Sequence, residues 1–128
     1  MSVRIVRLGT PRVKGEGLRI GTVRHPPRGV PVSQHASQNW YDVWLPELAP
    51  SAEAVKLGRA AVTKREWAKF LKRYRSEMAA PEKVRLIGLF AALSQRTNFS
   101  VGCYCEDASR CHRSELTRLL KARGARVE

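Results

Sequence analysis

The chain has 128 residues, and its 24 lysines and arginines against 11 aspartates and glutamates give a formal net charge of +13. This length predicts a single domain, residues 1–128, that buries a core of its own. No segment approaches the roughly 20 apolar residues that span a bilayer, and the N-terminus MSVRIVRLG lacks the apolar region of a signal peptide. We therefore expect a cytoplasmic protein with no membrane partner. The positive charge favours an anionic small molecule or a nucleic acid as partner.

Strand patterns come first in the chain. Residues 2–8 and 18–24 alternate β-branched with polar side chains, and turn-forming residues fill the stretch between them. The next segment, residues 25–32 (HPPRGVPV), carries three prolines, which exclude a helix and predict an extended loop. Residues 40–46 (WYDVWLP) predict a partly helical segment or a packed aromatic turn.

The middle of the chain has helical patterns. Thr63 and Glu66 form the capping-box pattern that begins a helix, which we expect to end near Ala79. Apolar residues recur on one face of this helix and predict core packing: Trp67, Phe70, Leu71, Tyr74 and Met78. Pro81 suits the first position of another helix, which is apolar nearly all round and is therefore expected to be buried.

The last part of the chain predicts one more strand and one more helix. Residues 99–105 (FSVGCYC) have the strand pattern, and leucines at positions 116, 119 and 120 mark a helix that ends near Gly124. Together the elements predict an α/β fold: a single compact domain with a small, partly parallel sheet packed by about four helices.

All three cysteines lie in residues 103–113 (CYCEDASRCHR), where the last strand passes into the last helix. Cys103 and Cys105 point to one face of the strand, and Cys105 lies nearer the C-terminal edge, where open α/β sheets hold ligands. With Asp107 or Ser109 as N-cap, residues 110–113 fall in the first helical turn, where free backbone N–H groups favour anions.

The helical wheel turns His112 inward and Cys111 toward solvent. Three interpretations stay open: an anion site formed by the helix N-terminus, Arg110 and Arg113; a metal site, zinc being one candidate; or buried cysteines and a hydrogen-bonded histidine that only connect strand to helix. The ligands of the metal site would be Cys103, Cys105, Cys111 and His112.

Four ordered motifs span nearly the whole chain: Arg24 with Pro27-Arg28-Gly29, Trp44 with Leu48-Ala49-Pro50-Ser51, Phe70 with Arg73-Tyr74 and Glu77, and Cys105-Glu106 with Cys111-His112-Arg113. With these motifs the chain resembles the family catalogued as domain of unknown function 488, particularly its YeaO-like branch. The resemblance implies a compact α/β fold and brings no settled reaction with it. Many YeaO-like members have an acidic residue, a leucine and a tryptophan where this chain has Val23, His25 and Pro26.

Arg24 and Arg28 flank the proline-rich loop, so with Arg113 they would form a pocket for phosphate or carboxylate. Trp44 and Tyr74 either stack on a base there or pack in the core. The leading hypothesis is a small cytosolic protein that binds phosphate, a nucleotide or nucleic acid at a pocket between a strand end and a helix N-terminus. The alternative is an enzyme in which His112 activates Cys105 as a nucleophile, and a further alternative is a metal-binding regulatory module.

Overall fold

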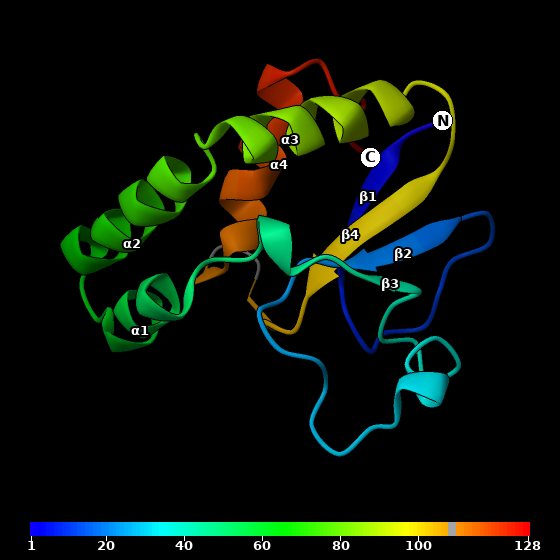
Figure 1. Cartoon of the computed structure of the whole chain (residues 1–128), viewed down its shortest axis with the longest axis horizontal. Helices are drawn as coiled ribbons and strands as arrows, with labels where there is room; N and C mark the ends of the chain where they lie inside the picture. Colours follow the sequence, from blue (N-terminus) through cyan, green and yellow to red (C-terminus); the bar gives the residue numbers. More distant parts are fainter. Residues whose placement is uncertain (108–109) are drawn as a thin grey trace.

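The computed structural model describes residues 1–107 and 110–128, and it confirms the α/β class (Figure 1). Four strands form one sheet: β1 (Val3–Arg7), β2 (Leu18–Gly21), β3 (Val43–Trp44) and β4 (Phe99–Cys103). The strand order is β1-β4-β2-β3, and every pair is parallel, where the sequence predicted a partly parallel sheet. The late strand β4 thus lies between the two N-terminal strands, which do not pair with each other.

Four α-helices accompany the sheet: α1 (Ala52–Ala60), α2 (Lys64–Glu77), α3 (Pro81–Leu93) and α4 (His112–Ala122). Two short 3-10 helices, η1 (Val32–Gln34) and η2 (Pro46–Leu48), lie in the connection between β2 and α1. Figure 1 shows the α-helices gathered on one side of the sheet, with α1 and α2 forming a hairpin that extends away from the strands. No helix in the described part of the chain has the length and apolar content needed to cross a membrane.

The main core lies between the sheet and the helices. It contains eleven buried residues: Val3, Ile20, Leu48, Tyr74, Met78, Ile87, Phe90, Phe99, Val101, Leu116 and Leu120. The predicted capping box of α2 is present, since Thr63 accepts from the backbone of Glu66 while the Glu66 carboxylate accepts from the backbone of Thr63. Phe70, Tyr74 and Met78 are buried as expected, whereas Trp67 is only partly buried.

The expectation that α3 is buried nearly all round is wrong. Ile87, Phe90 and Ala91 are buried, but Leu89 is 53% exposed and Leu93 is 37% exposed. The physical reason is that α3 lies at the outer edge of the helical layer, so only one of its faces meets the core (Figure 1).

Candidate functional site

A cavity of about 1180 Å³ opens where the strands end. Its walls come from the C-terminal ends of β1 and β4, the loop after β2, the α1–α2 hairpin and the start of α4. Parallel strands all present their carboxyl ends at the same edge, which is where α/β sheets bind ligands. The structure therefore has a cavity at the edge of the sheet where the sequence predicted ligand binding.

The cavity lining is strongly basic. Five arginines contribute to it: Arg7, Arg24, Arg28, Arg59 and Arg110. His25 and His112 also line it, and none of the described lining residues is an aspartate or a glutamate. Positive charge that converges in a concave site raises the local concentration of anions. The lining is thus suited to a ligand that carries negative charge.

Three of these arginines are held by the protein itself. Arg7 donates to the Tyr104 carbonyl at 3.3 Å and forms an ion pair with Glu106 at 3.4 Å. Arg24 donates hydrogen bonds to the carbonyl groups of residues 46, 49 and 50, at 3.0–3.2 Å. Arg110 donates to the Ala61 carbonyl at 2.8 Å, and its guanidinium carbon lies 4.8 Å from the centre of the Trp67 ring. Arg24 and Arg110, both predicted to bind anions, therefore line the cavity while fixing its walls.

Arg28 and Arg59 differ from them. Both side chains are exposed, and neither makes a hydrogen bond or ion pair with another residue in the described ranges. Arg28 comes from the proline-rich loop after β2 and was predicted from the sequence; Arg59, at the end of α1, was not. No local pattern marks Arg59, because an arginine in the last turn of a helix is common for reasons of helix stability.

Aromatic residues form part of the wall. Trp67 and Phe70 stack with ring centroids 4.6 Å apart, and Trp40 meets Tyr104 edge to face at 5.8 Å. The sequence assigned Trp67 and Phe70 to the core, since apolar periodicity marks a helix face and does not say whether protein or a cavity lies against it.

Tyr74 and Trp44 were expected either to stack on a base or to pack in the core, and the core alternative is confirmed for Tyr74. Tyr74 is fully buried in the core and donates to the Leu48 carbonyl at 2.8 Å. Trp44 is 42% exposed and donates to the Val23 carbonyl at 2.8 Å. Neither ring lines the cavity.

Helix α4 begins later than predicted. Its N-cap is Cys111, in an extended conformation, and His112 is the first helical residue. The predicted alternative N-cap Ser109 lies outside the described residues. The first turn consequently contains Arg113 but not Arg110.

Arg113 is 5% exposed and donates to the Cys105 carbonyl at 2.5 Å, and it is not among the cavity-lining residues. Burial lowers the pKa of its guanidinium. Its main contact therefore fixes the loop after β4, which carries Cys105. Cys105 itself is an exposed thiol that lines the cavity.

His112 points inward, as the helical wheel predicted. Its Nε2 lies 3.3 Å from the Thr22 hydroxyl, and its Nδ1 lies 3.7 Å from the Cys111 sulfur. Burial, with a smaller contribution from the positive charge of Arg113, lowers the pKa of His112 to about 4, so the ring is neutral at physiological pH. Within the described ranges no hydrogen bond joins His112 to Cys105, the pair that the sequence proposed for catalysis.

The expectation that Cys111 faces solvent is wrong, since it is 2% exposed. As an N-cap residue it has φ −143° and ψ 152°, so the helical wheel does not apply to its side chain. Its sulfur lies 2.50 Å from that of Cys103, and the two Cα atoms are 8.0 Å apart. The ligand atoms of Cys103, Cys111 and His112 all lie within 4.8 Å of one another, and the fourth predicted metal ligand, Cys105, is outside this group.

Comparison with known proteins gives one match. No curated protein and no solved structure matches the chain. The family model for DUF488-N3a, described as the active DUF488-N3 subclade, matches residues 3–124. Because the match covers nearly the whole chain, it confirms the resemblance to the domain of unknown function 488 family. The chain belongs to the DUF488-N3a family.

Proposed function

We propose that this protein binds a phosphate-bearing ligand, a nucleotide being the favoured class, in the cavity at the strand ends. The observation that carries the proposal is the lining of five arginines with no acidic residue among its described members. Phosphate oxygens accept hydrogen bonds from guanidinium groups in bidentate geometry, so arginine is the preferred residue for such ligands. Arg28 and Arg59, whose donors have no described protein partner, are the direct contacts.

The aromatic wall supports a nucleotide over free phosphate. Trp67 and Phe70 present a stacked pair beside Arg110, and a purine or pyrimidine ring binds such surfaces by stacking. The volume, about 1180 Å³, is slightly above the roughly 300–1,000 Å³ typical of small-molecule sites, so a nucleotide fits. Recognition of a nucleotide within a nucleic acid strand would use the same contacts and is a possible outcome of the test.

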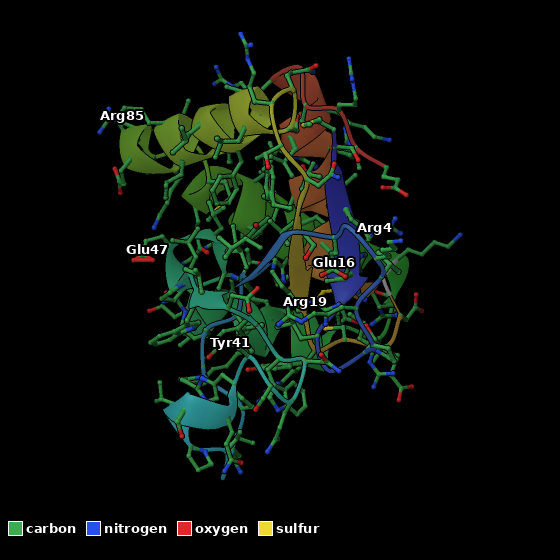
Figure 2. The ribbon with its side chains drawn as sticks, turned by 90° about the vertical axis from the view of Figure 1, so that its right-hand side faces the viewer. Arg4, Glu16, Arg19, Tyr41, Glu47 and Arg85 are labelled. Atoms are coloured by element: carbon green, nitrogen blue, oxygen red, sulfur yellow. A yellow bond between two sulfur atoms is a disulfide. The ribbon has the colours of Figure 1, made fainter. Side chains whose placement is uncertain are left out.

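Calorimetric titration with inorganic phosphate and with ADP tests this proposal. Arg28→Ala and Arg59→Ala should each weaken ADP binding by roughly 10- to 150-fold, the equivalent of a lost charged hydrogen bond of about 1.5–3 kcal/mol. Arg85→Ala is the matched control, since Arg85 projects from α3, which contributes no described residue to the cavity (Figure 2).

Equal weakening in all three variants would mean that overall charge, and not the cavity, attracts the ligand. Failure of both phosphate and ADP to bind at millimolar concentration would refute the proposal. If phosphate binds, single-stranded DNA binds tightly and ADP does not bind, the ligand of the cavity is a nucleic acid strand and not a free nucleotide.

A second candidate function is catalysis with Cys105 as nucleophile. The observation in its favour is that Cys105 is an exposed thiol inside the cavity lining, on a loop that Arg113 holds in place. The description of the family as active is in line with a reaction. Attack of the Cys105 thiolate on the β-phosphorus of ADP would form an S–P bond, break the bond between the β-phosphorus and the bridging oxygen, and release AMP. Intact-mass spectrometry after incubation with ADP should then show a phosphorylated chain that Cys105→Ser lacks; if the phosphorylated chain is absent, this catalytic function is refuted and only the binding proposal stands.

A further inference from the structure

We propose that Cys103, Cys111 and His112 bind a zinc ion at the base of the cavity, with the fourth coordination position open to the cavity. The three side chains are buried, their ligand atoms lie within 4.8 Å of one another, and all three residues line the cavity. Two thiolates and one imidazole are ligands that zinc prefers. The site depends on these residues alone and does not depend on the binding of phosphate.

The separation of the backbones favours a metal over a disulfide. The Cα atoms of Cys103 and Cys111 are 8.0 Å apart, whereas disulfides require about 4.4–6.8 Å. Zinc, with bonds of about 2.3 Å to sulfur and about 2.0–2.1 Å to nitrogen, separates its tetrahedral ligand atoms by roughly 3.5–3.8 Å. The present cluster needs only small side-chain movements to reach that geometry.

Thr22 selects the histidine nitrogen that binds the metal. Its hydroxyl donates to the Gly102 carbonyl at 3.0 Å, so toward His112 it acts as an acceptor. The Nε2 atom of His112 therefore carries the proton and donates it to Thr22. The lone pair is then on Nδ1, which faces the Cys111 sulfur. This is the orienting hydrogen bond that protein metal sites place behind a histidine ligand.

The fourth position distinguishes this site from a closed structural one. The remaining cysteine, Cys105, is exposed and lies outside the cluster, so the described residues supply three ligands. Three protein ligands and an open position are the pattern of zinc sites that bind water or a substrate oxygen. The open position faces the same cavity as the arginines, so a phosphate oxygen is the ligand class that would fill it.

Metal analysis of the full-length untagged protein, purified without chelator, tests the site. We expect about one zinc per chain, with most of it lost in Cys103→Ser and in Cys111→Ser. Cys105→Ser is the matched control, since it removes a neighbouring cysteine and should retain the metal. A protein without zinc that also fails to bind added zinc would overturn the proposal. So would a thiol titration in denaturant that finds one thiol before reduction and three after, because that result shows a disulfide.

Replacement of zinc by cobalt uses the wild-type chain, so the result does not depend on whether a variant folds. Cobalt in the site should give the intense near-ultraviolet thiolate-to-metal absorption and the visible bands of tetrahedral coordination. Added inorganic phosphate should bind at the open coordination position and shift the visible bands. Unchanged bands would overturn the proposal that this position is open. Zinc retention in a protein that binds neither phosphate nor ADP would refute the proposed function and leave the metal site standing.

Discussion

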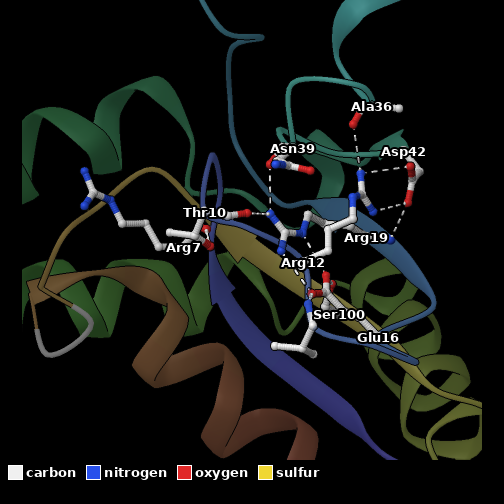
Figure 3. Close-up of polar contacts among 10 residues, drawn as sticks. Arg7, Thr10, Arg12, Glu16, Arg19, Ala36, Asn39, Asp42 and Ser100 are labelled. Carbon is white, nitrogen blue, oxygen red and sulfur yellow. Dashed lines mark hydrogen bonds and ion pairs between the residues drawn. The ribbon is translucent and has the colours of Figure 1, made fainter.

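At the scale of single residues, the side of the sheet away from the helices is organised by one buried ion pair (Figure 3). Arg19 is 0% exposed and donates four hydrogen bonds, two to the Glu16 carboxylate and two to the carbonyls of Thr10 and Asn39. Ser100 on β4 donates to the same carboxylate at 2.7 Å. A buried pair satisfied in this way is costly to break, because removal of one partner leaves an uncompensated charge.

Glu16 should make the protein sensitive to acid. Burial by itself would raise the pKa of this carboxyl, but hydrogen bonds from Arg19, Ser100 and the Val13 backbone outweigh it and lower the pKa from 4.5 to about 2. The unfolded chain therefore takes up the proton first as the pH falls. The stabilisation, on the order of 3 kcal/mol, is complete above about pH 4.5 and is lost between about pH 4.5 and pH 2.

Urea unfolding between pH 6 and pH 2.5 measures this effect. Glu16→Gln should lower the free energy of unfolding by about 3–5 kcal/mol near neutral pH and flatten its pH dependence below pH 4.5. Glu82→Gln, at an exposed position on α3, is the control and should behave like the wild type. A Glu16→Gln protein as stable as the control would show that the pair contributes nothing.

At the scale of elements, three of the family motifs meet where the α1–α2 hairpin joins the rest of the molecule. The Glu77 carboxylate, at the end of α2, accepts from the Ser51 backbone at 2.9 Å, from the Ser51 hydroxyl, and from Arg73 at 3.0 Å. Ser51 is also the N-cap of α1, and Arg24 holds the carbonyls of residues 46–50 just before it. These motif residues therefore position the hairpin that carries Arg59 and Trp67.

Glu77→Ala should destabilise the protein by about 2–3 kcal/mol, because it removes an acceptor of several hydrogen bonds, one of them from a charged group. The hairpin should also become less firmly attached, so ADP binding should weaken even though Glu77 is outside the cavity lining. Thermal unfolding and calorimetry measure the two effects, with Glu82→Ala as the control. An unchanged melting temperature would show that the Ser51–Glu77 link does not hold the hairpin.

Trp67 lines the cavity and also packs against Phe70. It is only partly buried, so Trp67→Ala should cost less than the roughly 3–5 kcal/mol of a fully buried aromatic residue. It should weaken ADP binding by roughly 5- to 150-fold, since stacking on a base contributes about 1–3 kcal/mol. Val62→Ala, at an 83% exposed position of the same hairpin, should alter neither quantity. If the Trp67→Ala protein is unfolded at room temperature, the sequence-based prediction that Trp67 packs in the core is correct instead.

At the scale of the whole molecule, the net charge of +13 acts together with the parallel sheet. The sheet brings chain segments far apart in sequence to one edge, and the arginines of those segments converge on the cavity there. Apart from the buried Arg19 and Arg113, most of the other lysines and arginines are exposed and come from segments throughout the chain. Dispersed charge attracts nucleic acid without reading its sequence.

Binding of nucleic acid, where it occurs, should therefore depend strongly on salt. Affinity for a single-stranded 20-mer, measured by fluorescence anisotropy, should fall by at least tenfold between 50 and 200 mM salt, because ion release dominates such binding. Several 20-mers of different sequence should bind alike. A salt-insensitive preference for one sequence would contradict this expectation and point to base-specific contacts.

Local patterns were sufficient to predict most elements. Strands at residues 3–7, 18–21 and 99–103 follow from alternation, and the start of α2 at Lys64 follows from its capping box. They were insufficient for β3, which has only two residues and was expected to be a turn or a partly helical segment. A strand so short has no periodicity to detect, and only its pairing with β2 defines it.

Composition and local periodicity were sufficient to predict the α/β class, the strongly basic charge and the sheet edge at which the cavity opens. Local patterns did not predict that Cys111 turns inward to Cys103, that Arg24 is held by carbonyl groups, or that Arg28 and Arg59 have no described protein partner. The physical reason is that hydrogen-bond partners and burial depend on residues distant in the chain. Insertion of β4 between β1 and β2 is the step that brings those residues together.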